Sequence, residues 1–206
     1  MSEGKAFMHR DDSKDNKRVG DMFETPPILT ELLLYNEKFE GNILEPCAGN
    51  GAMVKVLKEK LNNNISYFDK YYGDNKQDFL EYNESVTNII SNVPYGELTD
   101  KMVMHGKSIY TGKMALLLRT NYLSGQKRFF LNVYKELKTV YVYNRMPDLR
   151  FPIREDGLVQ NTAGIVYAFF VWEKGYVGDP SIKFLDISDK IAGKNKWKLI
   201  YIMVIA

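Results

Sequence analysis

The sequence predicts an α/β protein, in which helices cover both faces of a mostly parallel sheet. Segments rich in β-branched and aromatic residues alternate along the chain with segments of helical periodicity, which is typical of this class. The run from Met114 to Leu118 is apolar throughout, as expected of a strand buried on both faces. In such sheets ligands bind beyond the carboxyl ends of the strands, near the point where strand order reverses.

A single domain with a short appendage is expected. Residues 1–20 are mixed in charge and almost free of apolar periodicity, which predicts a flexible N-terminal arm. Residues 21–206 are numerous enough for one domain with a full hydrophobic core. The chain has no apolar segment long enough to span a membrane, and its longest late apolar run is "LIYIMVIA" at 199–206. That run is compatible with a final strand or with an exposed end.

Helices and strands are expected to alternate after the arm. The first helix starts after Thr25, which can cap it, and Ile28, Leu32 and Tyr35 share one face of it. The other expected helices span 52–61 and 124–137, and the expected strands lie in 42–45, 64–69, 86–96, 112–123, 138–146 and 163–175.

A glycine loop follows the strand at 42–45. Gly49 and Gly51 stand between this strand and the next helix, where glycine permits positive φ and close approach of a ligand to the backbone. The N-terminus of that helix favours a carboxylate or phosphate. The phosphate-loop pattern is absent, because Ala52 and Met53 follow Gly51, and the third glycine of the dinucleotide fingerprint is missing. A tight turn between strand and helix explains the glycines equally well.

Two carboxylates follow the glycine loop at informative distances. Asp69 lies 18 residues beyond Gly51 at the end of the next strand, where nucleoside-binding folds place an acceptor for ribose hydroxyls. Asp78 stands where a further strand would end and could accept a hydrogen bond from an adenine amine, with Phe79 packing on the ring. The alternative for Asp69 is a surface aspartate in a turn.

The stretch Asn92-Val93-Pro94-Tyr95 follows another apolar run. Asparagine and proline are common in turns, and an aromatic residue nearby often only covers the core. The stretch nevertheless joins the glycine loop and Asp69 as a third feature at the carboxyl end of an expected strand. A shared edge of the sheet favours a binding site over a simple turn.

The middle of the chain is strongly basic. Residues 101–154 hold 11 basic and 2 acidic residues, a net charge of +9, which predicts a polyanion-binding surface or, alternatively, a set of solvated helix faces. The helix expected at 124–137 has Phe129, Val133 and Leu137 at helical spacing. The candidate nucleic-acid contacts are Lys127, Arg128, Arg145, Arg150 and Arg154.

The motifs "ETPP", "ILEPCAGNGAM", "YFD", "DFL" and "SNVPY" resemble, in this order, those of S-adenosylmethionine-dependent N6-adenine methyltransferases, especially the small phage- or prophage-type DNA enzymes. The resemblance covers residues 23–95, and "AFFVWEKG" is similar to the aromatic final strand of these proteins. It implies a Rossmann-like class I methyltransferase fold, whose seven-stranded sheet is mostly parallel with one antiparallel strand. The basic segment within 97–160 would then recognise the substrate.

The resemblance also implies residue roles. Those facing the cofactor S-adenosylmethionine would be Phe23, Thr25, Glu45, Pro46, Ala48, Gly49, Gly51, Asp69, Asp78 and Phe79. Asn92, Val93, Pro94 and Tyr95 would hold the target base. The Asn92 side-chain oxygen and the Val93 carbonyl would accept hydrogen bonds from the adenine amine, and Tyr95 would stack on a base that has left its helix. Val93 replaces the proline usual in the family, yet its carbonyl can fill the same role.

Other functions remain open on the sequence alone. The same tetrapeptide motif occurs in methyltransferases acting on RNA adenine, cytosine N4 and protein glutamine amides, and the basic segment favours nucleic acid, with DNA first and RNA possible. A catalytically weakened homologue that binds cofactor and nucleic acid is a further alternative, as is a plain nucleotide-binding protein. Cys47 is the only cysteine, and His9 and His105 have no local partners, so no metal is expected. The expected location is the cytoplasm of a bacterium or a phage-infected host.

Overall fold

One twisted sheet organises the chain. The structure, a computed structural model, describes residues 24–144 and 165–187. Across these two ranges, seven strands form one sheet in the order β2-β1-β3-β4-β6-β5-β7. The strands are β1 (Ile43–Glu45), β2 (Ile65–Tyr67), β3 (Val86–Ser91), β4 (Tyr110–Arg119), β5 (Leu137–Tyr143), β6 (Tyr167–Glu173) and β7 (Ser181–Leu185). Neighbouring strands run parallel except at β6, which is antiparallel to both β4 and β5. The expected seven-stranded, mostly parallel sheet is confirmed.

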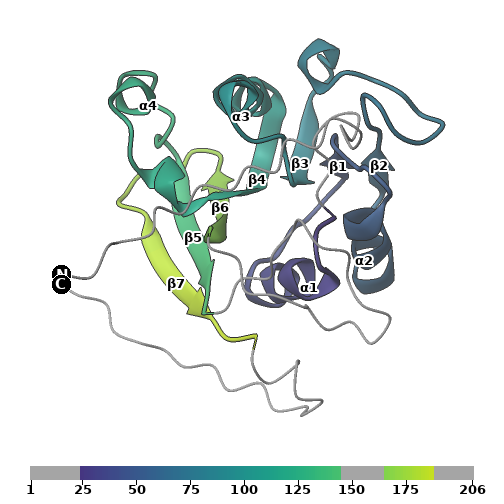
Figure 1. Cartoon of the computed structure of the whole chain (residues 1–206), viewed down its shortest axis with the longest axis horizontal. Coiled ribbons are helices and arrows are strands. Elements are labelled where there is room, and N and C mark those ends of the chain that lie inside the picture. Colours follow the sequence, from purple (N-terminus) through teal and green to yellow (C-terminus); the bar gives the residue numbers. More distant parts are fainter. Residues whose placement is uncertain (1–23, 145–164, 188–206) are drawn as a thin grey trace, which may run out of the picture.

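Helices cover both faces of this sheet. The described part of the chain has α1 (Pro27–Asn36), α2 (Ala52–Lys60), α3 (Glu97–Ile109) and α4 (Gln126–Phe130), with short 3₁₀ turns η1 (Phe79–Glu81) and η2 (Thr120–Leu123). In Figure 1, α1 and α2 lie on one side of the sheet, and α3 and α4 lie on the other. The predicted α/β class with helices on both faces is therefore confirmed.

The strand order reverses beside β1. This strand pairs with β2 on one side and with β3 on the other. After β1 the chain enters α2 on one face, whereas after β3 it enters α3 on the opposite face (Figure 1). The two connections diverge at the edge where the carboxyl ends of the parallel strands meet. Divergence of this kind opens a crevice at that edge, which is where ligands of open α/β sheets bind.

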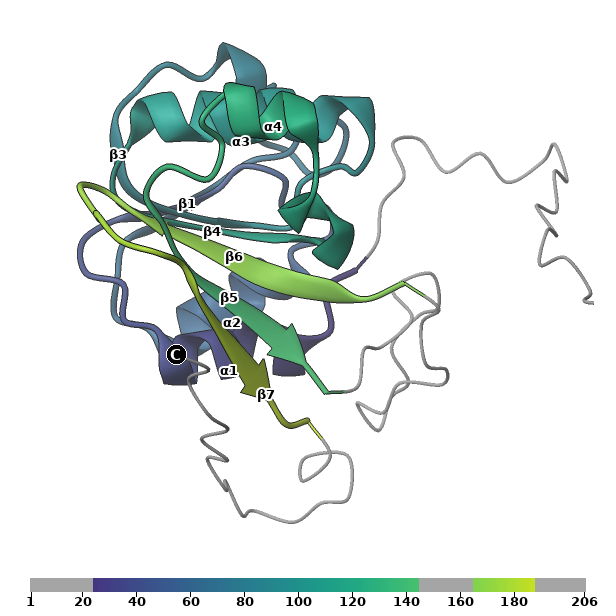
Figure 2. The same cartoon turned by 90° about the vertical axis from the view of Figure 1, so that its left-hand side faces the viewer.

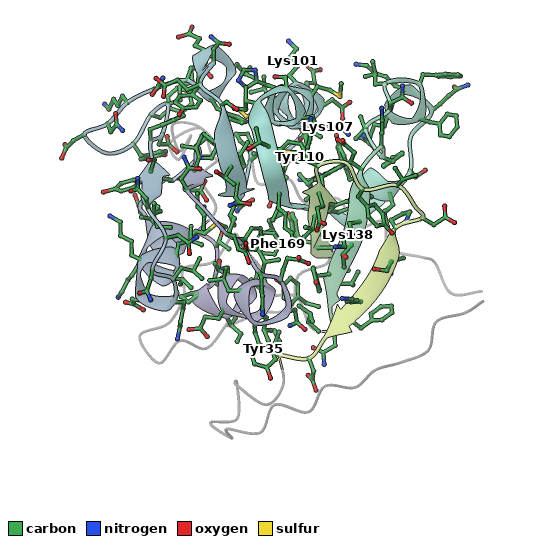
Figure 3. The ribbon with its side chains drawn as sticks, turned by 180° about the vertical axis from the view of Figure 1, so that it is seen from behind. Tyr35, Lys101, Lys107, Tyr110, Lys138 and Phe169 are labelled. Carbon is green, nitrogen blue, oxygen red and sulfur yellow. The ribbon has the colours of Figure 1, made fainter. Side chains whose placement is uncertain are left out.

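Alternating side chains of the central strands enter two cores. On β4, Met114 and Leu116 contribute to the core beneath α3, whereas Ala115 and Leu117 contribute to the core above α1. Phe169 of β6 belongs to the second core and lies between the sheet and α1 (Figure 3). A strand with core on both sides has no polar face, which explains the uninterrupted apolar run seen in the sequence.

The first helix departs from the prediction at its start and on its buried face. α1 begins at Pro27, its N-cap is Pro26, and no side chain caps it, so the assignment of Thr25 as cap is wrong. Its buried apolar residues are Leu29, Leu32 and Leu33. Tyr35 is 57% exposed and lies on the solvent side of α1 (Figure 3). α1 packs on the sheet through the face that holds Leu29, Leu32 and Leu33, which leaves Tyr35 outside the core.

The helix expected at 124–137 is much shorter than predicted. α4 ends at Phe130, and the chain then turns through Asn132 and Glu136, whose φ angles are 52° and 67°. Two residues in the left-handed region cannot continue a right-handed helix. Leu137 already belongs to β5, and Phe129 is 71% exposed, so the expected helical face does not exist.

Two elements were not predicted at all. α3 buries Met102, Val103, Gly106 and Ile109, and their helical spacing in the sequence is a signal for this helix. β7 follows the strand expected to be last; Ile182 and Phe184 alternate with Ser181 and Lys183, a short strand pattern, although four of its five residues are exposed. The predicted arm at 1–20 and the apolar run at 199–206 lie outside the described residues. No helix in the described ranges is long and apolar enough to cross a membrane.

Candidate cofactor and substrate site

A cavity of about 270 Å³ opens at the carboxyl edge of the sheet, between β1 and β3. Most of the sequence-predicted site residues that the structure describes line it. They are Thr25, Glu45, Ala48, Gly49, Asp69, Asp78, Phe79, Asn92, Val93, Pro94 and Tyr95. The structure thus brings together residues that are up to 70 positions apart in the sequence. Pro46, Gly51, Lys127 and Arg128 are not among the lining residues, and Phe23 lies outside the described residues.

The glycine loop curls tightly at the mouth of this cavity. Gly49 and Gly51 have φ angles of 53° and 82°, a region that other residues rarely adopt. Gly51 donates its N–H to the Ala48 carbonyl at 2.8 Å and serves as the N-cap of α2. A Cβ on Gly51 would meet no atom within 4 Å, so the backbone angle, rather than crowding, requires glycine here. Ala52 and Met53, in the first turn of α2, also line the cavity.

Asp69 joins the glycine loop to the loop after β2. Its Oδ2 accepts a hydrogen bond from the Gly49 N–H at 2.9 Å. Its Oδ1 accepts from the N–H groups of Tyr71 and Tyr72 at 2.8 and 3.1 Å. β2 ends at Tyr67 rather than at Asp69, which pairs with Lys76 in an isolated bridge. The carboxylate therefore fixes two loops that line the cavity.

Glu45 is the most perturbed acid of the cavity. It is 1% exposed, and its Oε1 accepts hydrogen bonds from the Ser91 hydroxyl at 2.6 Å and the Cys47 N–H at 3.0 Å. Its Oε2 is buried and has no hydrogen-bond partner within the described structure. Burial raises the pKa of Glu45 to about 8. Near neutral pH this carboxyl group is therefore largely protonated, and a cation placed beside it would favour its ionised form.

Asp78 and Phe79 form the opposite wall. Asp78 caps η1 by accepting from the Leu80 N–H, and it pairs with Lys70 at 2.6 Å. The hydrogen bond from Lys70 holds the pKa of Asp78 below its usual value. No strand ends at Asp78, so that prediction is wrong, although the side chain does reach the cavity. Phe79 is 2% exposed and packs edge-on against His105, with ring centroids 5.0 Å apart.

Asn92 is held on both ends of its amide. Its Nδ2 donates to the Thr25 hydroxyl at 3.1 Å, and its Oδ1 accepts from the Tyr95 hydroxyl. Thr25, which does not cap α1, therefore orients the Asn92 side chain instead. Val93 is buried, and the Pro94 carbonyl accepts from the Thr99 hydroxyl at 3.0 Å, which ties the stretch to the first turn of α3. The stretch is a rigid connection from strand to helix rather than a loose turn.

Tyr95 packs among residues that the sequence analysis did not select. Its ring lies 5.0 Å from the Tyr167 ring, and the Arg119 guanidinium lies 5.4 Å from the Tyr95 centroid. Burial raises the pKa of the Tyr95 hydroxyl well above its usual value, so the hydroxyl stays a donor at neutral pH. Arg119 ends β4 and pairs in register with Tyr167 at the start of β6. Only the sheet order brings these two residues next to Tyr95.

Many cations of the basic segment are engaged in structural contacts. Arg128 pairs with Asp100 at 3.0 Å, and its guanidinium lies 4.2 Å from the Tyr122 ring centroid. Lys113 pairs with Glu37 and Glu173. Lys127 is exposed on α4, and Arg145, Arg150 and Arg154 lie outside the described residues. Most of the segment 97–144 builds α3, β4 and β5, so the net charge of +9 overstates the basic surface.

The fold can now be compared with known structures. The M protein of the type I restriction enzyme EcoKI matches with a TM-score of 0.50 at 13% identity, covering 79% of this chain and 48% of its own. Thermoplasma acidophilum 1320 matches with a TM-score of 0.50 at 12% identity, covering 73% and 89%. The E. cuniculi Mtq2–Trm112 complex, responsible for methylation of the eRF1 termination factor, matches with a TM-score of 0.48 at 15% identity, covering 72% and 93%.

These likenesses identify the fold as the Rossmann-like fold of class I methyltransferases. The chain spans about half the length of the EcoKI M protein that it resembles. No family model and no curated protein sequence matches the chain. Among the described residues, no group of three or more histidine, cysteine, aspartate or glutamate side chains could hold a metal ion.

Proposed function

We propose that this chain transfers a methyl group from S-adenosylmethionine to the N6 amine of adenine in DNA. The observation that supports this most directly is the held amide of Asn92 at the wall of the cavity. Thr25 and Tyr95 fix the side chain so that its oxygen lies on the Tyr95 side. An amide oxygen has two lone pairs, so it can accept from a substrate amine in addition to, or in exchange for, the Tyr95 hydroxyl.

The acidic lining of the cavity supports the proposed cofactor. S-adenosylmethionine carries an ammonium and a sulfonium, and the buried Glu45 offers an unpaired carboxyl oxygen to a cation. Asp69 at the glycine loop would hold the ribose, and Asp78 with Phe79 would hold the adenine. Gly49 keeps the loop free of a Cβ where the backbone approaches. When bound, the cofactor supplies a methyl group on a positively charged sulfur, which is open to attack by a nitrogen lone pair.

The residues of this chain would prepare the target amine. Its lone pair is delocalised into the adenine ring, which makes it a weak nucleophile. Hydrogen bonds from the amine to Asn92 Oδ1 and the Val93 carbonyl would favour a tetrahedral nitrogen with its lone pair turned toward the methyl group. No strong base is required, because the proton leaves a nitrogen that has become cationic. Val93 is buried in the core, which suits a residue that contributes only its main chain.

The substrate would approach over the carboxyl edge of the sheet. Residues 21–206 would form one domain, and within 97–160 the parts available for recognition are the connections after β4 and β5. Lys127 lies in the first connection, and Arg145, Arg150 and Arg154 belong to the second. The proposal favours DNA because of the motif resemblance and the basic residues, and RNA adenine is the substrate to test beside it.

The test is methyl transfer from labelled S-adenosylmethionine to unmethylated duplex DNA, with RNA and protein in parallel, followed by nucleoside analysis. We expect N6-methyladenine in DNA, and we expect Asn92→Ala to lower kcat by about 100-fold or more while cofactor binding persists. Asn83→Ala, an exposed asparagine beyond the cavity, is the control and should be fully active. Label in RNA or protein alone would overturn the choice of substrate, and cofactor binding without any transfer would indicate a non-catalytic homologue.

A further inference from the structure

Arg119 lies at the edge of the sheet where the site lies. It is half-buried at the carboxyl end of β4, the neighbour of β3, which leads into Asn92. Its Nε is buried and has no hydrogen-bond partner within the described structure. No carboxylate in the described ranges pairs with its guanidinium. A buried donor without an acceptor is unfavourable for the folded protein.

Other cations of the same segment are satisfied within the protein. Arg128 has Asp100, Lys113 has Glu37 and Glu173, and Lys138 has Glu173. These pairs hold elements together and leave little charge for a ligand. Arg119 differs because its recorded contact is with the Tyr95 ring, at 5.4 Å from the centroid. A guanidinium that stacks on an aromatic face keeps its N–H edge directed away from the ring, toward an acceptor.

The position of Arg119 is rigid. It lies in the antiparallel ladder between β4 and β6, opposite Tyr167. The next residue, Thr120, donates its N–H to the Val166 carbonyl at 2.9 Å, which closes the end of the ladder. Figure 2 shows β4 and β6 side by side, and Figure 1 shows β4 next to β3. The backbone therefore holds a positive charge beside Tyr95, whose hydroxyl donates to Asn92.

We propose that Arg119 binds a phosphate of the nucleic-acid strand next to the target adenine, while its guanidinium stays stacked on Tyr95. This inference rests on the proposed function, which it extends by naming a substrate contact that the motifs do not include. A phosphodiester oxygen would accept charge-assisted hydrogen bonds from the terminal Nη groups of this half-buried guanidinium. The same contact would fix the sugar-phosphate chain beside the base that Asn92 receives.

The proposed ligand of Arg119 is the nucleic acid and not the cofactor. Arg119 does not line the cavity that holds Glu45, Asp69 and Asp78, whereas Tyr95 does. The Tyr95 side chain therefore lies between the cavity, which it lines, and Arg119, which lies over its ring. Loss of the Arg119 charge should accordingly weaken nucleic-acid binding and leave cofactor binding unchanged.

The experiment measures binding of duplex DNA to the complex with S-adenosylhomocysteine at several salt concentrations, and kcat and KM for methyl transfer to the same DNA. The variants are Arg119→Met, Arg119→Lys and the control Lys55→Met, which removes an exposed charge from α2 on the other face of the sheet. For Arg119→Met we expect the slope of log binding constant against log salt to fall by about 1. KM for DNA should rise about tenfold.

Arg119→Lys should keep the salt slope, since the charge remains, but should lose affinity because an ammonium lacks the planar fork of donors and stacks less well on Tyr95. This variant keeps the test decisive where the methionine variant folds poorly. An unchanged slope in Arg119→Met, or a loss of S-adenosylhomocysteine binding in place of DNA binding, overturns the phosphate contact. Absence of methyl transfer by the wild type, together with a salt slope that still depends on Arg119, would overturn the proposed function and support the contact.

Discussion

At the scale of single residues, the site depends on side chains whose environments differ from those of ordinary surface groups. Glu45 has one carboxyl oxygen satisfied by Ser91 and Cys47 and the other buried without a partner. Thr25 and Tyr95 hold the two ends of the Asn92 amide. Removing solvent strengthens each of these interactions and makes an unmatched group unfavourable. The unpartnered Oε2 of Glu45 is therefore unfavourable for the folded protein, whereas the satisfied amide of Asn92 is not.

Glu45 gives the first prediction at this scale, which concerns pH. Without cofactor its pKa is about 8, and a cation beside it favours the ionised form, so binding should release a proton. We expect the affinity for S-adenosylmethionine to rise by up to about tenfold per pH unit between pH 6 and 8 and then to level off. In Glu45→Gln the pH dependence of the affinity should reflect only the titration of the cofactor's own amine. Calorimetry of both proteins across this range measures the difference, and identical profiles would exclude the contact.

The same group predicts the sign of the stability change. The pKa of Glu45 is raised from 4.5 to about 8, so the folded state retains a proton that the unfolded state has lost. The stability that the protonated Glu45 contributes is fully present below pH 4.5 and is lost as the pH rises through about 8. Glu45→Gln should therefore unfold at higher denaturant concentration than the wild type above pH 8, while it binds cofactor more weakly.

At the scale of elements, the position of α3 depends on Gly106, which has no side chain. A Cβ on Gly106 would lie 2.5 Å from Met114 Sδ and 3.6 Å from both Ile89 and Phe79. Met114 is fully buried on the central strand, so its side chain has little room to move. Gly106 thus allows α3 to approach β3, β4 and the Phe79 wall of the cavity. The close packing of this helix links the core to the site.

We expect Gly106→Ala to destabilise the protein by about 1–3 kcal/mol through overpacking, even though alanine favours helix formation. It should also weaken cofactor binding, because Phe79 shares the crowded space. Denaturant unfolding and cofactor titration measure the two effects. Lys101→Ala, at an exposed position of the same helix (Figure 3), is the control for helix propensity and should be neutral or slightly stabilising. The double variant with Met114→Val should recover part of the loss, and strict additivity would contradict the steric explanation.

At the scale of the whole molecule, the two edges of the sheet have different tasks. The cavity, Asn92 and Arg119 lie at the carboxyl edge. At the opposite edge Lys113 pairs with Glu37 and Glu173, and Glu173 also pairs with Lys138 at 2.8 Å. Glu37 is buried and also accepts from the Tyr141 hydroxyl at 2.8 Å. This network joins α1 to β4, β5 and β6 and is far from the proposed chemistry along the strands.

Lys113→Met should therefore separate stability from activity. It leaves the buried Glu37 carboxylate without its cation, which we expect to lower the free energy of unfolding by about 2 kcal/mol. The kcat and KM of the folded protein should not change. Urea unfolding and steady-state kinetics at a temperature well below the transition provide the measurement. A variant with normal stability and reduced turnover would show that the two edges are coupled.

The sequence by itself determined the α/β class and the mostly parallel sheet, because these features depend on local patterns. It also indicated half of the residues that line the cavity, some of them only through the resemblance to methyltransferase motifs. Apolar runs such as 114–118, glycines at Gly49 and Gly51, and polar residues after strands can be recognised without knowing what lies beside them. Only the tertiary structure decided that Thr25 holds Asn92, that Tyr95 packs between Tyr167 and Arg119, and that α4 ends at Phe130. Those outcomes depend on strand order and on the pairing of charges and hydrogen-bonding groups between distant segments, which no window of the sequence contains.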